Sequence, residues 1–356
     1  MTTHPHPSDS TPPTDVQHGS SSRAVRIQRD QVQSALERLI TEGNPRIGAQ
    51  RLVRNAARHG IDLDLVWGIL GDPKQNQPAV RQVCMVVPGA GGTGMCFVSS
   101  PKQGGVAGST AQLDAFKAFG SESIQIDEIG ASLVAAIEDL PEVAGDRVKI
   151  AQMLFEPKNE WFHTICQRAS MTCVGTLDYL RMDFGRIREL ESAQADWGDG
   201  IVVRAIRDLS METPTSDGSL LARALERSYD RTLDCPELCG MRSMPDVIES
   251  HRSTGVFDTS RWWLMLKEGE PVGCCLLTHC PPNESVELVY LGLGPEVQGR
   301  GFGKRLLVHA LRSLRIKDTV YEVTCAVDRR NSPASNVYLS LGFQRFDARV
   351  GYVRPV

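Results

Sequence analysis

The stretch Glu287–Leu307, ELVYLGLGPEVQGRGFGKRLL, contains an apolar strand, a glycine-rich turn and the start of a helix, in that order. From Phe302 onward, apolar residues recur at helical spacing and cations occupy the opposite face. Gly299, Gly301 and Gly303 allow the backbone to turn its N–H groups toward one point, and the dipole of the following helix adds partial positive charge there. The stretch therefore predicts an anion site that suits a pyrophosphate.

Two familiar phosphate motifs do not fit this turn. It does not end in Gly-Lys-Ser/Thr, as a Walker loop requires, and no acidic residue is placed to bind a ribose, as the dinucleotide fingerprint requires. Arg300, Lys304 and Arg305 add positive charge beside the turn, and Arg329 and Arg330 follow in the next loop. These cations favour a polyphosphate that carries a further phosphate group.

Residues 89–94, GAGGTG, satisfy the glycine pattern G-x-G-x-x-G but lack its context. A phosphate loop of that kind needs a helix that opens directly out of the turn. Here Met95–Val98 continues as an apolar strand, and the order strand, turn, strand predicts a hairpin. We expect an exposed, flexible turn without a nucleotide, with a cofactor turn as the alternative.

The rest of the second half predicts one mixed unit around the opening stretch. Apolar periodicity and turn residues such as Glu268–Pro271 set its elements. We expect helices over 220–229, 246–252, 302–314 and 333–341, strands over 202–206, 262–267, 272–278, 285–293 and 321–327, and a closing strand pair that ends near Tyr352.

The first half repeats this order of elements in a weaker form. A shift of 172 residues, the distance from Thr172 to Gln344, also superposes Glu156–Asn159 on Asp328–Asn331. A repeat of this kind predicts two domains from one duplicated unit, and two unrelated α/β units are the alternative. The expected helices are 31–40, 49–59, 129–140 and 160–169, and the expected strands are 24–27, 65–70, 80–87, 95–98 and 148–155.

The chain divides into four segments on this interpretation. Residues 1–22 are rich in Pro, Ser, Thr and His and predict a disordered tail. Residues 23–190 form the first domain, 191–200 (ESAQADWGDG) an acidic polar linker, and 201–356 the second domain. The fold class is α/β, more narrowly α+β, with a mixed, mostly antiparallel sheet flanked by helices in each domain.

Composition excludes several classes of protein. A net charge of −4 disfavours a general nucleic-acid binder. No apolar run is long enough for a membrane span and no secretory leader is evident, so we expect a cytoplasmic protein without a membrane partner. The ten cysteines lie mostly in apolar runs without a CxxC pair. Cys274, Cys275, His279 and Cys280 are the one cluster to consider as a metal site, and a buried strand explains them better.

Two motifs in the second half resemble the signatures of the GNAT acyltransferase superfamily. Gln298–Gly303 (QGRGFG) matches the Q/R-x-x-G-x-G/A turn of that family, and Asn331–Phe343 (NSPASNVYLSLGF) resembles its second signature. The resemblance covers residues 201–356 well and the first half only in outline. It implies two tandem GNAT-like domains, of which the first is degenerate.

The resemblance implies acetyl-CoA as co-substrate and no metal. In the family, pantetheine lies along the strand before the turn, and a backbone N–H at or near Leu291 polarises the thioester carbonyl. The cofactor-binding residues implied are Leu291, Gly292, Leu293, Gln298, Gly299, Arg300, Gly301, Phe302, Gly303, Lys304 and Asn331.

The resemblance also implies two catalytic groups. Glu287, in the register of the family's catalytic glutamate, is the candidate base that deprotonates an amine, and strand alternation places it on the same face as Leu291. Tyr338 is the candidate acid that protonates the CoA thiolate, and Asn331 contacts pantetheine or positions the helix of Tyr338. Alternatively, Glu287 is a solvated strand residue and Tyr338 a core aromatic. Glu284, Tyr290 and Glu296 are reserve candidates.

The first copy is predicted to be catalytically silent. Its third strand is followed by 99–105, SSPKQGG, which lacks the family turn, and Cys166 occupies the place of Tyr338. Of the signature residues of the second copy, only Asn331 has an identical counterpart in the first, Asn159. The sequence thus predicts an N-acetyltransferase that moves acetyl from acetyl-CoA to an amine by direct attack, with a non-catalytic CoA-binding regulatory or scaffold protein as the alternative. The acceptor and the oligomeric state are left open.

Overall fold

The computed structural model describes residues 23–75, 77–102, 114, 117–190, 197–208, 219–316 and 319–356. The predicted tail, part of the predicted linker (191–196) and residues 103–113, with Gly104 and Gly105, lie outside this range. The boundaries predicted for the two domains therefore stay predictions.

Local sequence explains where the helices of the first half begin. Asn44, followed by Pro45, accepts a hydrogen bond from the Ile47 N–H, and Ser121 accepts one from the Ile124 N–H. The described elements of this half are β1 (Val25–Arg26), α1 (Val32–Leu39), α2 (Pro45–Asn55), β2 (Val66–Leu70), β3 (Val80–Gly89), β4 (Thr93–Val98), α4 (Glu122–Val143), β5 (Ile150–Phe155), α5 (Trp161–Arg168) and β6 (Thr172–Asp183).

The second half has the same order of strands and helices. A shift of 172 residues superposes β6 on β12 over their whole lengths, as Thr172 falls on Gln344 and Asp183 on Pro355. Its elements are β7 (Ile201–Ala205), α6 (Leu220–Tyr229), α7 (Met244–Arg252), β8 (Trp262–Lys267), β9 (Glu270–Cys280), β10 (Ser285–Leu293), α8 (Phe302–Arg312), β11 (Glu322–Asp328), α9 (Ser332–Ser340) and β12 (Gln344–Pro355).

In the described residues, the strands of both halves form one twelve-stranded sheet with the order β1-β2-β3-β4-β5-β12-β6-β11-β10-β9-β8-β7. Most neighbours are antiparallel, and the pairs β4–β5 and β10–β11 are parallel. The predicted mixed, mostly antiparallel α/β fold is therefore confirmed. The predicted closing strand pair is wrong, because each half ends in one long strand.

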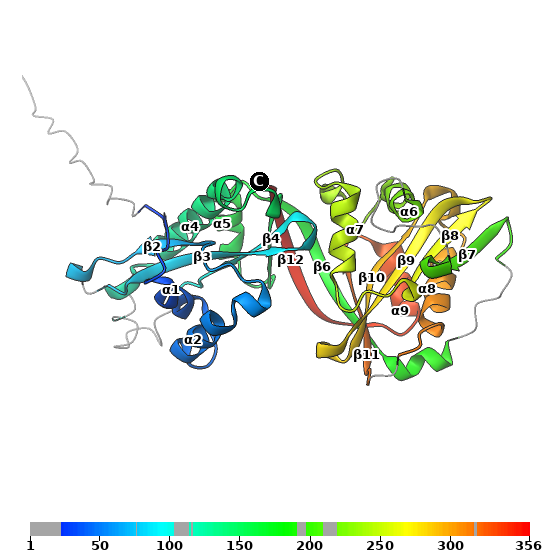
Figure 1. The fold of residues 1–356 in the computed structure, drawn as a ribbon, viewed down its shortest axis with the longest axis horizontal. Helices are drawn as coiled ribbons and strands as arrows, with labels where there is room; N and C mark the ends of the chain where they lie inside the picture. Colours follow the sequence, from blue (N-terminus) through cyan, green and yellow to red (C-terminus); the bar gives the residue numbers. More distant parts are fainter. Residues whose placement is uncertain are drawn as a thin grey trace, which may run out of the picture.

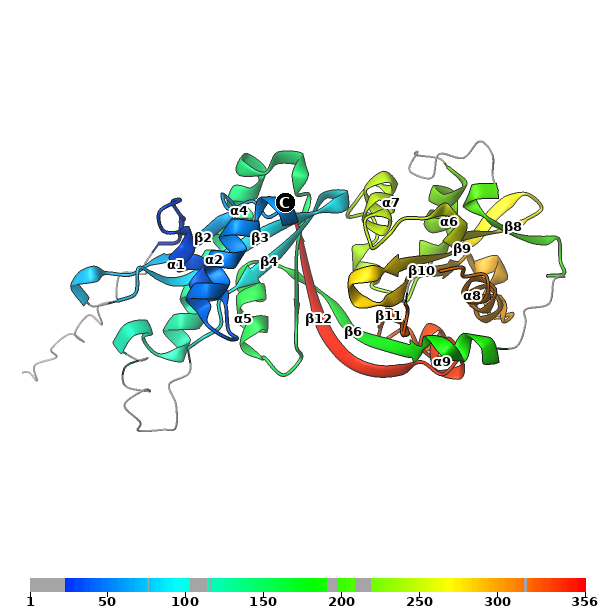
Figure 2. The ribbon, with the colours of Figure 1, turned by 60° about the horizontal axis from the view of Figure 1, so that its bottom comes forward.

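The two closing strands are exchanged between the halves. β12 pairs with β5 of the first half, and β6 pairs with β11 of the second half. β6 and β12 also pair with each other along their lengths, and they run side by side between the two lobes in Figure 1 and Figure 2. Each half thus completes its sheet with the last strand of the other.

The cores follow this exchange. Leu180 and Met182 of β6 pack with α8 and α9 in the core of the second half, whereas Val350 and Tyr352 of β12 pack with α4 and α5 in the core of the first. α1 and α2 cover the other face of the first half's strands, and α6 covers the other face of the second half's. Separate halves would each lose part of their core.

The glycine-rich turn at 89–94 is a second contact between the halves. The turn between β3 and β4 confirms the predicted hairpin. Its centre is not exposed as predicted, because Gly91 is buried and faces α7. Ser250 donates a hydrogen bond to the Ala90 carbonyl at 3.0 Å, and Lys149 forms an ion pair with Asp246 at 2.8 Å. The glycines allow α7 to approach this backbone.

In the described part of the chain, no helix is long and apolar enough to cross a membrane.

We expect Gly91→Ala to destabilise the protein more than Gly60→Ala does. Both glycines have a φ of +66°, but a Cβ at Gly91 would lie 1.9 Å from the Asp246 carbonyl oxygen, whereas nothing lies within 4 Å of one at Gly60. The left-handed conformation costs both variants about 1 kcal/mol, and overpacking costs Gly91→Ala about 1–3 kcal/mol more. Urea unfolding measures the difference, and equal losses would show that the turn does not hold α7.

Candidate functional site

The central feature of the second half is a split between β10 and β11. The two strands pair in parallel from Ser285↔Glu322 to Leu288↔Cys325, where the ladder ends although both strands continue. Beyond that point β10 pairs only with β9, and β11 pairs with β6. Among the residues that the structure describes, one side of the β10 backbone over 291–293 therefore has no strand partner. We call this place the strand split.

A β-bulge in β10 accompanies the split. Its register against β9 shifts between Leu288 and Tyr290, which inserts an extra residue and reverses the alternation of side chains. Leu288 and Leu291 consequently both pack against the core under α8. The prediction that Glu287 and Leu291 share a face is therefore wrong, because strand alternation alone does not reveal a bulge.

The glycine turn lies directly after β10, as predicted. Gly299 and Gly301 have φ of +71° and +77°, and nothing lies within 4 Å of a Cβ built on either one. Gly301 is the N-cap of α8, and no side chain caps that helix. Gln298 closes the turn by donating a hydrogen bond to the Leu293 carbonyl at 2.8 Å. The exposed backbone at 298–301 and the uncapped helix are thus open to an anion.

The cations predicted around the turn have different surroundings. Arg300 forms an ion pair with Asp199 and lies over the Phe302 ring, whereas Lys304 is exposed. Arg329 pairs with Asp178 at 2.6 Å, and Arg330 bonds Asp328 and Glu237. The expectation that Arg329 and Arg330 are available to a phosphate is therefore wrong, since carboxylates already neutralise them.

Glu287 is half-buried on the face of the sheet opposite α8. Burial raises the pKa of its carboxyl, and a hydrogen bond from the Cys280 thiol at 3.9 Å partly offsets that rise. The neighbouring Thr278 hydroxyl donates to the Thr254 carbonyl at 2.7 Å. A carboxylate with a raised pKa is a better proton acceptor than an ordinary one.

Tyr338 lies on the other face, with 5% of its surface exposed. Burial raises its pKa well above the ordinary value, and the nearby thiols of Cys325 and Cys275 raise it further. Cys325 belongs to β11, and Cys275 lies opposite Leu291 in the β9–β10 ladder. Tyr338 is therefore next to the strand split, and its phenol keeps its proton at neutral pH.

Asn331 acts within the structure as a helix cap. It is the N-cap of α9, and its side chain accepts a hydrogen bond from the Ala334 N–H at 3.2 Å. This bond fixes the start of the helix that carries Tyr338. This cap agrees with the positioning role predicted for Asn331, and its contact with pantetheine stays a prediction.

The reserve candidates have structural surroundings. The Tyr290 hydroxyl lies 2.7 Å from the Ser228 hydroxyl, and Glu296 forms an ion pair with Arg227. Glu284 is exposed after a short turn at the start of β10. Of the three, Tyr290 lies against the strand split, because a Cβ built on Gly292 would lie 2.6 Å from its ring.

A network around Asp328 escaped the sequence analysis. Asp328 is fully buried and accepts hydrogen bonds from the N–H of Cys235 at 3.1 Å and from the Arg330 guanidinium at 2.6 Å. Arg330 also bonds the Val174 carbonyl of β6 at 2.8 Å. The network joins β11, the exchanged strand and the loop before α7. The sequence analysis named Asp328–Asn331 but did not predict this network, because the partners Cys235, Val174 and Glu237 lie far away in the chain.

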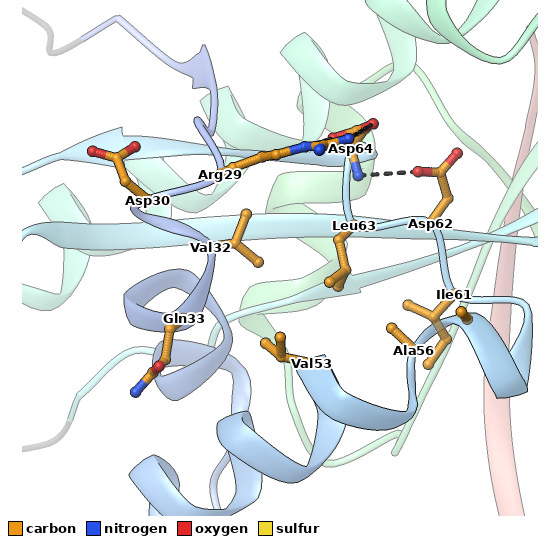
Figure 3. Close-up of a pocket in the computed structure, with 11 residues that line it drawn as sticks. Arg29, Asp30, Val32, Gln33, Val53, Ala56, Ile61, Asp62, Leu63 and Asp64 are labelled. Carbon is orange, nitrogen blue, oxygen red and sulfur yellow. Dashed lines mark hydrogen bonds and ion pairs between the residues drawn. The ribbon is translucent and has the colours of Figure 1, made fainter.

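The first half repeats the strand split, because β4 and β5 pair in parallel only as far as Met95↔Gln152 although both strands continue, but the side chains near it differ. α5 has no side-chain cap, so Asn159 does not repeat the role of Asn331, and Cys166 contacts the Met153 sulfur at 3.9 Å. A pocket of about 700 Å³ lies between α1, α2 and the chain at Ile61–Asp64, with the Arg29–Asp64 ion pair at its rim (Figure 3). This pocket contains none of the predicted site residues.

Within the described residues, no group of three or more His, Cys, Asp or Glu side chains could hold a metal ion. Cys274 and Cys275 are buried in β9.

Residues 225–343 match the model of the acetyltransferase (GNAT) family. The mycothiol acetyltransferase of Saccharopolyspora erythraea is 28% identical over 170 residues, which are 48% of this chain and 52% of that protein. That of Paenarthrobacter aurescens is 30% identical over 187 residues, 48% of this chain and 54% of that protein. The chain thus spans about half the length of the curated relatives that it matches.

A GCN5-related N-acetyltransferase from Sphaerobacter thermophilus has a similar fold along both halves. The TM-score is 0.51 at 14% identity, with 93% of this chain and 95% of that chain covered. This likeness supports the tandem arrangement that the repeated order of elements predicts. The predicted arrangement is similar to that of mycothiol synthase.

We expect Asp328→Asn to destabilise the protein by about 2 kcal/mol or more, because it removes the charge from a buried group that accepts several hydrogen bonds. The matched control is Asp178→Asn at the more exposed pair with Arg329, for which we expect about 0–1 kcal/mol. Urea unfolding of both variants measures the two losses. A smaller loss for Asp328→Asn than for the control would contradict the role of the network.

Proposed function

We propose that the protein moves an acetyl group from acetyl-CoA to an amine acceptor, because residues 225–343 match the model of the acetyltransferase (GNAT) family. The observation that carries the proposal is the strand split next to an uncapped helix and an open glycine turn. The split offers backbone groups to an extended chain, and the turn offers N–H groups to phosphates. Pantetheine and pyrophosphate are joined in that order in CoA.

Each end of CoA is assigned to its own part of the chain. The pantetheine lies along Leu291, Gly292 and Leu293 in the strand split. The pyrophosphate meets the backbone at 299–303, where the exposed Lys304 contributes positive charge and Arg300 does so once it is released from its ion pair with Asp199. Gln298 and Asn331 act by holding the turn and the start of α9.

The positions of Glu287 and Tyr338 suit direct attack. The acceptor approaches from the Glu287 face as an ammonium ion, gives one proton to that carboxylate, and the free amine forms a C–N bond with the thioester carbon. The nitrogen then loses its second proton to solvent, which balances the proton that the leaving sulfur gains. A backbone N–H near Leu291 stabilises the oxyanion. As the C–S bond breaks, the CoA sulfur departs toward the opposite face, where the neutral Tyr338 phenol donates a hydrogen bond or its proton.

The acceptor is proposed at the level of an amine. Because the relatives are named mycothiol acetyltransferases, the unacetylated form of mycothiol is one compound to test. We further propose a cytoplasmic location. The alternative is a non-catalytic CoA-binding regulatory or scaffold protein, in which the open turn holds CoA and neither Glu287 nor Tyr338 affects any turnover.

We expect Gly301→Glu to abolish acetyl-CoA binding, because it places a carboxylate where the phosphates lie. Gly269→Glu is the matched control, since Gly269 also has a positive φ, +86°, with nothing within 4 Å of an added Cβ, and it lies in the β8–β9 turn. Isothermal titration with acetyl-CoA measures both variants. Unchanged binding by Gly301→Glu would show that the site is wrongly assigned.

We expect Glu287→Gln and Tyr338→Phe to lower kcat about 100-fold while acetyl-CoA binding is retained, the usual size of a lost acid or base. Burial raises the pKa of Glu287, so the neutral carboxyl persists to higher pH and the rate rises as the carboxylate forms. Glu287→Gln should remove this rise of the rate with pH and leave the separate rise that comes from deprotonation of the acceptor amine. The measurement is steady-state acetylation of an amine panel, with the exposed Tyr321 changed to Phe as control. If neither variant alters turnover, the alternative function is favoured.

A further inference from the structure

We propose that Tyr179, which the first half supplies on the exchanged strand β6, positions the acceptor as an ammonium ion beside Glu287. This inference rests on the proposed acetyltransferase function and adds a residue to its acceptor site. It also identifies the acceptor chemistry: a primary amine that arrives protonated and binds against an aromatic ring.

The strand register places Tyr179 on the same face as Glu287. Glu287 lies opposite Thr324 of β11, and Thr324 lies opposite Arg181 of β6. Two residues further along both strands, Ala326 lies opposite Tyr179. Directly opposed residues and residues two apart share a face. Tyr179 is therefore diagonal to Glu287 and two strands away from it, with β11 between them.

Ala326 marks an uncovered part of this face. β11 is an interior strand with β10 on one side and β6 on the other, yet Ala326 is exposed. It also lies just past Cys325, where the β10–β11 ladder ends. The small Ala326 side chain thus separates the strand split from the half-buried Tyr179 ring, and a ligand above Ala326 would touch both.

Charge around the ring favours a cation. Burial raises the pKa of Tyr179, Arg349 lowers it, and the nearby carboxylates of Glu287 and Asp347 raise it further. Arg349 donates a hydrogen bond to Asp347 at 2.6 Å, which compensates its charge. Glu287 adds a carboxylate on the same face of the sheet, on the other side of β11. An aromatic face next to a carboxylate attracts an ammonium ion.

Phe346 of the other exchanged strand extends the aromatic surface. Its ring meets that of Tyr179 edge-on, with centroids 6.4 Å apart and planes at 71°, and 48% of its surface is exposed. The Arg181 guanidinium lies over the Phe346 ring at 5.2 Å, so that ring already holds a cation. The Tyr179 ring is the one beside Glu287, and it is the one that receives the acceptor.

The test compares Tyr179→Leu, which removes the ring, with Tyr179→Phe, which keeps it. The acceptors are glucosamine, putrescine and the unacetylated form of mycothiol, and KM is measured separately for acceptor and acetyl-CoA. We expect Tyr179→Leu to raise the acceptor KM about 5- to 30-fold, the size of a partly desolvated cation–π contact. We expect Tyr179→Phe to stay within about threefold of wild type, and the KM for acetyl-CoA to be unchanged in both.

Tyr321→Leu is the matched control, because Tyr321 is 63% exposed just before β11, and it should behave as wild type. Tetramethylammonium, which carries the charge and cannot be acetylated, should inhibit the wild type competitively against the acceptor and not against acetyl-CoA. This measurement needs no variant and so remains informative if Tyr179→Leu does not fold.

Three results would overturn the inference while leaving the proposed function intact: an unchanged acceptor KM in Tyr179→Leu, a parallel rise of both KM values, or a lack of inhibition by tetramethylammonium. If the wild type binds acetyl-CoA but acetylates no acceptor in the panel, the proposed function itself fails and the inference falls with it.

Discussion

The pairing of β6 with β12 is the constraint on which the rest of the structure depends. Each strand closes the sheet of the half to which it does not belong, so the two cores cannot form independently of each other. The same pairing sets the register of β11, because beyond the strand split β6 is its only neighbour among the described strands. The Asp328–Arg330 network then fixes β11 to β6 and to the loop before α7. The candidate site is therefore built where the two halves interlock.

Sequence predicted most elements because their patterns are local. The strand Ser285–Leu293 and the strand Trp262–Lys267 have the predicted bounds, and the hairpin at 89–94 follows from the strand that continues after its glycines. The strand exchange was not predictable in the same way. A shift of 172 residues superposes β6 on β12, so either strand satisfies the same apolar pattern, and the pattern does not tell which half receives it.

The site was predicted less completely than the fold. The open backbone at Gly299 and Gly301 agrees with the motif, since positive φ and turn geometry are properties of the glycines themselves. The face of the sheet on which Leu291 lies depends on a bulge in β10. The ion pairing of Arg329 and Arg330 depends on carboxylates far away in sequence. Tyr179 was not singled out, because only the exchanged strand brings it near Glu287. Long-range pairing decides such positions.

The exchange also has a consequence for synthesis on the ribosome. β5 ends at Phe155, but the strand that covers its free edge, β12, begins only at Gln344. Translation from the end of β5 to the end of β12 takes roughly ten to forty seconds, and β12 cannot pair with β5 before then. An uncovered edge strand is a template for pairing with other chains. The nascent first half is therefore the stage at which this protein is most prone to aggregate, and chaperone demand should fall once the last residues emerge.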